Sequence, residues 1–150
     1  NATGATHRVA ARLIDLGVDA GDVNHRLFES KTPAQLKAEA ATAERTVVTG
    51  DGRIAYAVLE RPLLDRYGEE YFETAIDIVR AVAGVTIAFT VKEQKNGDLR
   101  ISLRSTAAGV AAVAAVHGGG GHARAAGCTF SRVAADDAVR TLVSELAPIA

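Results

Sequence analysis

The stretch VTIAFTVKEQKNGDLRISLR, residues 85–104, carries the strongest fold signal in this chain of 150 residues. Apolar and polar side chains alternate over residues 85–91 and again over residues 99–104. The turn-forming pair Asn96-Gly97 lies between the two runs. Alternation with a period of two is typical of a β-strand that buries one face, so the stretch predicts two strands joined by a turn.

Working outward from this pair of strands, the periodicity of apolar residues and the turn signals predict further elements. Gly50-Asp51-Gly52 between two β-like runs indicates a hairpin. The other expected strand covers residues 128–130, and helices are expected at residues 3–16, 22–29, 32–44, 74–82, 110–116 and 134–146. The resulting fold class is α/β, with a mixed sheet of about five strands flanked by helices and preceded by an N-terminal helical segment.

The expected helix at residues 32–44 marks a junction. It begins with a capping-box signal, Thr32-Pro33-Ala34-Gln35, and offers only Leu36 and alanines for burial. A helix that is polar on most faces often connects two units. We therefore expect three segments: residues 1–31, a connecting helix at 32–46, and a domain at 47–150.

Composition and charge exclude several classes of protein. The chain is 48% hydrophobic and 23% charged with a net charge of −1, so any binding of nucleic acid must come from a local cluster of cations. A single cysteine, Cys128, excludes a disulfide framework and a zinc-binding set. The single cysteine also favours a reducing, cytoplasmic location. No apolar run of about 18 residues is present, so we expect no membrane span. Because the chain starts with Asn1 and has no methionine, we expect it to be part of a longer protein.

Four glycines followed by a histidine, residues 118–122, are the main candidate for chemistry. Helix termination alone would account for one or two glycines, whereas a run of four exposes backbone N–H groups that can approach phosphate closely. No Lys-Ser or Lys-Thr follows, so the run is not a Walker loop, and a helix rather than a strand precedes it, unlike a dinucleotide fingerprint. The run therefore predicts an anion site formed by Gly118, Gly119, Gly120, Gly121 and His122.

Arg104 and Ser105 form a second candidate at the end of a predicted strand. A guanidinium group beside a hydroxyl suits phosphate oxygens. If the two strands of the opening stretch pair, Arg100, Ser102 and Lys92 lie near Arg104.

No complete catalytic set is visible. His117 and His122 bracket the glycines, but two imidazoles without a carboxylate or thiolate make a poor metal site. Neither paired aspartates with histidine nor a Ser/His/Asp arrangement occurs, so we expect no metal in this chain and regard His122 at most as an assisting residue.

Residues 119–127, Gly-Gly-Gly-His-Ala-Arg-Ala-Ala-Gly, resemble the signature of the C-terminal associated domain of the DHH (Asp-His-His) phosphoesterases. Leu103-Arg104-Ser105 also fits this family, and residues 1–30 resemble the tail of its catalytic domain, so the resemblance covers essentially the whole chain. The most similar subgroup is the bacterial oligoribonuclease type. Its members degrade very short RNAs, and some cleave linear or cyclic dinucleotides or remove the 3′-phosphate of phosphoadenosine phosphate.

The resemblance implies that two manganese ions are held by a catalytic domain upstream of Asn1, and that this chain binds no cofactor and is inactive alone. It implies that His122 and the glycine backbone contact the substrate phosphate, while Arg104 and Ser105 contact a backbone or terminal phosphate. We add Arg124 to this expected binding set. The expected partners are a short RNA or nucleotide and the chain's own N-terminal catalytic domain, with a homodimer left open.

Two alternatives remain at this point. The first alternative is a non-catalytic nucleic-acid-binding module, because alanyl-tRNA synthetases and single-strand exonucleases carry related domains. The near-neutral charge and the few aromatic residues argue against a long polyanion track. A purely structural assembly domain is the second, and it leaves the glycine–histidine run without an explanation.

Overall fold

The computed structural model describes residues 2–49, 51–107 and 109–150, so Asn1, Ala108 and Gly50 of the expected hairpin turn lie outside the described residues. The chain divides into two compact units, Asn1–Pro33 and Ala34–Ala150. Within the described residues no helix is long and apolar enough to cross a membrane.

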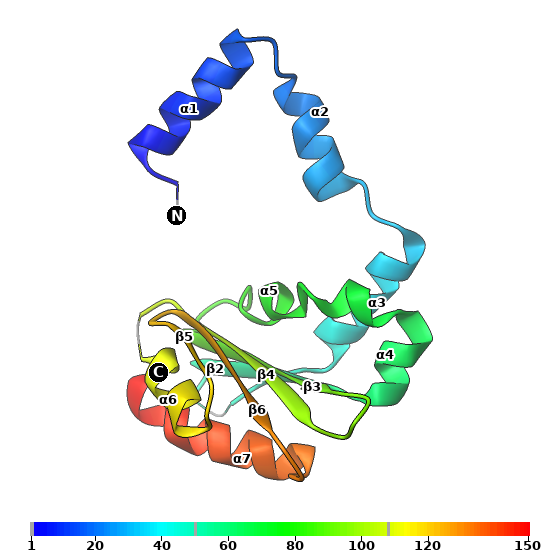
Figure 1. Cartoon of the computed structure of the whole chain (residues 1–150), viewed down its shortest axis with the longest axis vertical. Coiled ribbons are helices and arrows are strands. Elements are labelled where there is room, and N and C mark those ends of the chain that lie inside the picture. Colours follow the sequence, from blue (N-terminus) through cyan, green and yellow to red (C-terminus); the bar gives the residue numbers. More distant parts are fainter. Residues whose placement is uncertain (1, 50, 108) are drawn as a thin grey trace. The chain divides into compact units, whose positions relative to one another are not determined.

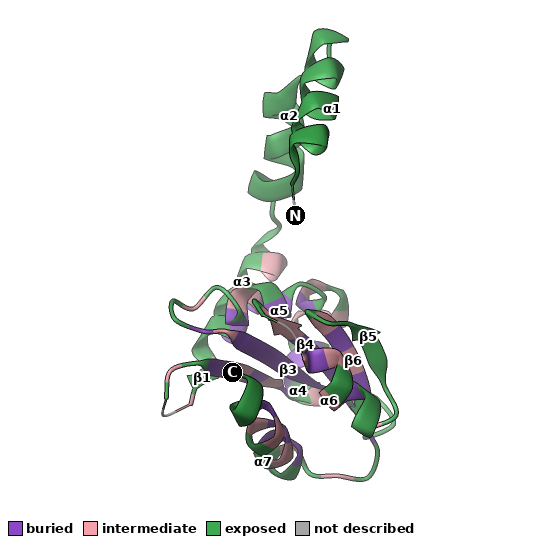
Figure 2. Ribbon diagram, turned by 90° about the vertical axis from the view of Figure 1, so that its left-hand side faces the viewer, coloured by how far each residue is buried: buried purple, intermediate pink, exposed green. Residues whose placement is uncertain are grey.

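The first unit is helical, with α1 at Gly4–Asp15, α2 at Ala20–Asn24 and a π-helical turn η1 at His25–Glu29. The hydroxyl of Thr3 accepts the N–H of Thr6, which caps α1, and a carboxylate oxygen of Asp19 caps α2. Both expected helices are present, although the second begins at Ala20. Every described residue from 2 to 33 is exposed, including its apolar side chains (Figure 2).

The second unit contains a six-stranded sheet in the order β1-β2-β3-β4-β6-β5. Strands β2 and β3 are parallel, and the other neighbouring pairs are antiparallel. The strands are β1 Thr46–Val48, β2 Ile54–Leu59, β3 Ile87–Glu93, β4 Leu99–Ser105, β5 Gly120–His122 and β6 Ala125–Phe130. The helices are α3 Pro33–Glu44, α4 Arg61–Tyr67, η2 Glu69–Phe72, α5 Ala75–Val79, α6 Val110–Val116, α7 Ala135–Leu146 and η3 Ala147–Ile149.

Helices cover both faces of this sheet (Figure 1). On one face, α6 and α7 pack against apolar side chains from β2, β3, β4 and β6, such as Phe89, Leu103 and Phe130. On the other face, α3, α4 and α5 form a second core with residues of β2 and β3, including Leu59 and Ala88. The expected mixed α/β sheet with an N-terminal helical segment is confirmed.

Four details differ from the sequence-based expectation. A sixth strand, β5, was missed because a three-residue strand with two glycines has no apolar alternation. The helix α4 was also missed, and the helix expected at residues 74–82 is only Ala75–Val79. Leu36 was expected to be buried but is 53% exposed, because α3 instead packs through small residues such as Ala38 and Ala41.

The second helical layer covers only part of the sheet, and this positions the site. All side chains of β3 from Ile87 to Lys92 are buried, because β3 has helices on both faces. In β4, Leu99, Ile101 and Leu103 are buried in the α6–α7 core, whereas the intervening residues are exposed or half-buried. The face of β4, β6 and β5 that points away from α6 and α7 is therefore accessible; we call it the open face.

Candidate functional site

Strand register brings two of the predicted residues, Arg104 and His122, onto the same face of the sheet. Arg104 of β4 lies opposite Ala125 of β6, and Ala125 lies opposite His122 of β5. Side chains that are directly opposite in neighbouring strands point to the same side. Arg104 and His122 therefore flank Ala125 at a distance of two strand spacings, about 9–10 Å between backbones. We call this set of three residues the Arg104–His122 row.

The Ala125-Ala126-Gly127 segment is small for structural reasons. Ala126 points into the core and is 7% exposed, while Ala125 and Gly127 are on the open face. A Cβ on Gly127 would lie 2.8 Å from the carbonyl oxygen of Ile101 in the neighbouring strand. Only glycine allows β4 and β6 to approach this closely, and the side chain between Arg104 and His122 is the single methyl group of Ala125.

The first glycine of the run ends helix α6. Gly118 has a φ of 70°, and its N–H bonds to the carbonyl of Ala115 at 3.1 Å. The N–H of Gly119 bonds to the carbonyl of Ala114 at 2.9 Å. These two bonds form a Schellman motif, in which glycine in the left-handed conformation terminates a helix. Gly118 thus has the helix-ending role that the sequence analysis judged insufficient for the whole run.

Two further glycines allow close packing against β6. A Cβ on Gly119 would lie 2.1 Å from the carbonyl oxygen of Gly127, and one on Gly121 would lie 2.5 Å from the carbonyl oxygen of Ala125. Gly120 differs, because its Cβ would meet no atom within 4 Å and its φ is not left-handed. Among the four glycines, therefore, only position 120 could accept a larger residue without strain or a clash. The open space beside Gly120 is available to a ligand.

A groove of about 560 Å³ adjoins the glycine run and the open face. Its lining includes Gly118, Gly119 and Gly120 together with polar side chains of the open face. Those side chains are Arg100, Ser102, Arg104 and Thr129. Gln94 and His117 also line the groove, whereas His122 does not. Sequence reasoning named Arg100 and Ser102 as neighbours of Arg104 but missed Thr129, whose place opposite Arg100 depends on strand pairing.

Local hydrogen bonds fix the backbone around Ser105 and Arg124. The hydroxyl oxygen of Ser105 accepts the N–H of Ala107 at 3.1 Å, which leaves the hydroxyl hydrogen able to donate. The guanidinium Nε of Arg124 donates to the carbonyl of Ala107 at 2.7 Å, and the carbonyl of Arg124 accepts the N–H of Ser105 at 2.9 Å. These bonds hold the turn between β5 and β6 against the end of β4.

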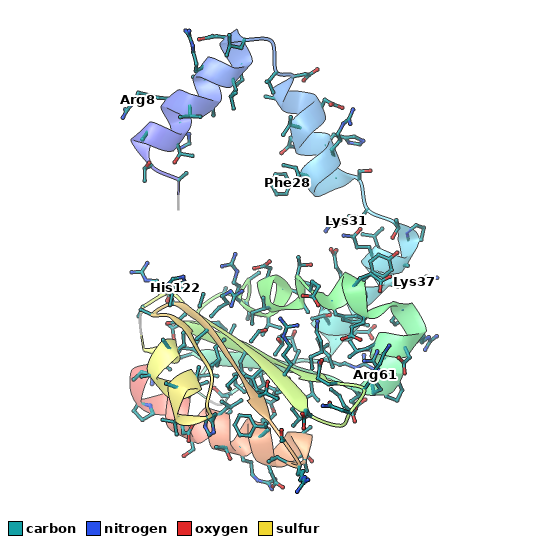
Figure 3. All side chains as sticks on the ribbon, viewed as in Figure 1. Arg8, Phe28, Lys31, Lys37, Arg61 and His122 are labelled. Atoms are coloured by element: carbon teal, nitrogen blue, oxygen red, sulfur yellow. The ribbon has the colours of Figure 1, made fainter. Side chains whose placement is uncertain are left out.

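His122 is exposed at the end of β5 next to the two-residue turn Ala123-Arg124 (Figure 3). Within residues 2–49, 51–107 and 109–150, no hydrogen bond or ion pair holds its ring. An imidazole in this position can donate a hydrogen bond to a bound anion.

His117, unlike His122, is among the residues that line the groove beside the glycines, but its ring is already held by other side chains. Its Nε2 atom lies 2.7 Å from a carboxylate oxygen of Glu145 in α7, and its ring centroid lies 4.4 Å from that of Phe130. Phe130 is part of the α6–α7 core, so the His117 ring is on the face of the sheet opposite the open face. Its contacts join the end of α6 to α7 and β6. Sequence reasoning missed this pair because its two members are 28 positions apart.

Lys92 lies opposite Arg100 as expected, but Glu73 neutralises it. The ammonium group is 2.9 Å from a carboxylate oxygen of Glu73, and the Lys92 side chain is only 8% exposed. The hydrogen bond from Lys92 lowers the pKa of Glu73 from its usual value of 4.5, with burial opposing this and the charges of Lys92 and Arg100 adding to it. The free positive charge of the open face therefore comes from arginines rather than from Lys92.

In the part of the chain that the structure describes, no three His, Cys, Asp or Glu side chains gather in a cluster that could hold a metal ion. Cys128 is buried under the glycine run, and burial followed by the charge of Glu145 raises the pKa of its thiol to about 11. A thiol in this state is a small apolar core residue rather than a nucleophile.

A comparison with protein-family models identifies the family of this chain. The DHHA1 domain model matches residues 52–147, so the chain belongs to the DHHA1 domain family, the domains that accompany a DHH catalytic domain. The match contains the sheet from β2 to β6 together with the glycine run and the Arg104–His122 row.

Two solved structures have a similar fold. An exopolyphosphatase-related protein from Bacteroides fragilis superimposes with a TM-score of 0.86 at 19% identity, covering 98% of this chain and 45% of that one. A pGpG-specific phosphodiesterase, PggH, from Vibrio cholerae gives a TM-score of 0.58 at 14% identity, covering 95% of this chain and 51% of that one. This chain therefore spans about half the length of the solved proteins that it resembles.

Proposed function

We propose that this chain is the substrate-binding part of a manganese-dependent phosphoesterase. The proposed substrates are short oligoribonucleotides, linear or cyclic dinucleotides, or phosphoadenosine phosphate. The observation that carries the proposal is the Arg104–His122 row. It presents a guanidinium group and an imidazole on either side of one methyl group, on the same face of the sheet.

The charges of the site suit one or two phosphates. Arg104 supplies a fixed positive charge, and His122 and the exposed guanidinium of Arg124 supply further donors. Ser105 lies opposite Ile87 of the α6–α7 core, so its hydroxyl points to the other side of β4 from Arg104. The backbone of Gly120 is accessible from the groove, so a phosphate oxygen can approach it closely. The net charge of the chain is only −1, so these local groups rather than a global field would attract the anion.

The proposal assigns substrate binding to this segment and assigns the manganese ions to a catalytic domain of the same protein. The apolar side chains of the first unit support a covalently linked partner domain. They are 40–70% exposed on residues 9–28, and burial of such side chains against another domain is strongly favourable. The residues concerned are Val9, Leu13, Ile14, Leu16, Val18, Val23, Leu27 and Phe28.

The test measures binding of inorganic phosphate and of an RNA dinucleotide to the 150-residue chain by NMR titration. We expect Arg104→Ala and His122→Ala each to weaken dinucleotide binding by about tenfold or more, because each removes a charge-assisted hydrogen bond worth about 1.5–3 kcal/mol. Arg140→Ala is the matched control, since Arg140 is an exposed arginine on α7. Failure of wild type to bind either ligand, or equal losses in Arg140→Ala, would contradict the proposal.

A non-catalytic module that tracks long single strands is the alternative, and ligand length separates the two functions. Each phosphate contact to a single strand adds about −0.7 to the slope of log K against log salt concentration. A site built on the Arg104–His122 row predicts a slope of about −1 and similar affinities for a dinucleotide and a 20-mer. A tracking module predicts a much steeper slope and a clear preference for the 20-mer.

A further inference from the structure

We propose that a second hollow, between α5 and the end of β4, is a nucleobase subsite. In this arrangement the base of a nucleotide lies in the hollow while its phosphate lies at the Arg104–His122 row. The inference rests on the proposed function, because it assigns the base of the same ligand whose phosphate that row would hold.

The hollow adjoins the row directly. It has a volume of about 350 Å³, and its lining includes Arg104 and Ser105 together with residues of α5, of the segment after it, and of β3. Ala88 of β3 lies opposite Arg104, so the row continues across one more strand into the hollow. Arg104 also lines the groove beside the glycines, and it therefore stands between the two depressions.

The lining changes in character on the two sides of Arg104. The glycine groove has polar side chains such as Arg100, Ser102 and Thr129. The hollow has an apolar wall of Val85, Ala88 and Ala81. A flat, largely apolar ring gains most from such a wall, whereas a phosphate gains nothing there.

Polar groups at the rim of the hollow complement the edge and the face of a base. Arg80 pairs with Asp77 at 2.9 Å, and both side chains are about half exposed, so a planar guanidinium is held at the rim where it can stack on a base. The hydroxyl of Thr86 donates to the carbonyl of Arg53, and that of Thr106 donates to the carbonyl of Thr86. Both threonine oxygens, with the Asp77 carboxylate, thus remain as acceptors for the N–H and amino groups of a base.

The test compares two ligands that share a sugar and a phosphate and differ in the base. Guanosine 5′-monophosphate and ribose 5-phosphate are titrated into the full chain and followed by NMR chemical shifts. Guanosine is chosen because its edge includes an amino donor that suits an acceptor-rich rim. We expect wild type to bind the nucleotide about tenfold more tightly than the sugar phosphate, the increment that a single stacked base can supply.

One substitution fills the hollow from its rim. Ala81 is exposed and lines the hollow, so Ala81→Leu adds bulk there without disturbing a buried position. We expect Ala81→Leu to remove the tenfold preference for the nucleotide and to leave the affinity for ribose 5-phosphate unchanged. Ala83 is also exposed but does not line the hollow, so Ala83→Leu is the matched control and should keep the preference.

A second variant tests the stacking group. Arg80→Ala should reduce the preference for the nucleotide, whereas Arg140→Ala should not, although Arg140 forms the same kind of pair with an aspartate three positions earlier. Equal affinities of wild type for the two ligands, or an unchanged preference in Ala81→Leu, would overturn the base subsite while leaving the phosphate site intact. Binding of neither ligand by wild type would overturn the phosphate site as well.

Discussion

Gly119 and Gly120 are adjacent in the sequence, yet alanine at the two positions should have opposite consequences. A Cβ on residue 119 would lie 2.1 Å from the carbonyl oxygen of Gly127 and 2.6 Å from the Cβ of Cys128. Both distances are far inside van der Waals contact, and the first partner is backbone that cannot rotate away. Either β6 must shift or the glycine run must separate from it.

These contacts allow an estimate of the loss in the free energy of unfolding. Overpacking of a well-packed position typically costs 1–3 kcal/mol, and a clash with strand backbone belongs at the upper end, so we expect Gly119→Ala to lower the free energy of unfolding by about 3 kcal/mol. Gly120→Ala places its Cβ where no atom lies within 4 Å, so its effect on stability should stay within about 0.5 kcal/mol.

Urea unfolding followed by far-ultraviolet circular dichroism measures both values, since the chain has no tryptophan to report by fluorescence. Phosphate titration of the folded Gly120→Ala variant then tests the ligand role of this residue. We expect binding about tenfold weaker, because the new methyl group occupies the space through which an anion approaches the backbone. Equal unfolding midpoints for Gly119→Ala and wild type would refute the packing argument, and unchanged phosphate binding in Gly120→Ala would refute the ligand role.

Three other predictions concern residues outside the glycine run. Cys128, with its thiol pKa of about 11, should react with a thiol reagent at pH 8 only when urea unfolds the chain; rapid labelling of the native protein would contradict its burial. Because the pKa of Glu73 is lowered, its pair with Lys92 should contribute stability above about pH 4.5 and lose it as the pH falls further. Glu73→Gln should therefore be less stable than wild type at pH 7 in urea unfolding, and the difference should shrink as the pH falls below 4.5; a difference that does not change with pH would rule out ionisation as the cause. His117→Ala should cost about 1–2 kcal/mol, since it removes the bond to Glu145, and an unfolding midpoint in urea equal to that of wild type would contradict a stabilising role for this pair.

Much of the fold could be predicted because its signals are local. Alternation over residues 85–104 predicts two strands and also which side chains of β4 share a face. The glycine–histidine segment and Arg104 could be selected as candidate site residues, because glycine runs and guanidinium groups have chemical properties that depend little on context. The prediction that Lys92 lies near Arg100 is confirmed by the pairing of β3 with β4.

Other features could not be read from the sequence. Strand β5 is too short to show a periodic pattern of side chains, and only Glu60 separates α4 from the end of β2. Four glycines look alike in a sequence. In the structure, however, Gly118 ends α6, and Gly119 and Gly121 pack closely against β6. Gly120 has open space where a side chain would be. These differences depend on the position of β6, which is a non-local contact.

The sequence alone determined that this protein has alternating strands, a histidine after a glycine run, and an arginine at the end of a strand. Only the tertiary structure decided that Arg104 and His122 share a row with Ala125, and that His117 lies on the other side of the sheet. The physical reason is that periodicity assigns side chains to faces within one strand. The neighbours of that strand, and the helices that cover each face, follow from burial of apolar surface contributed by the whole domain.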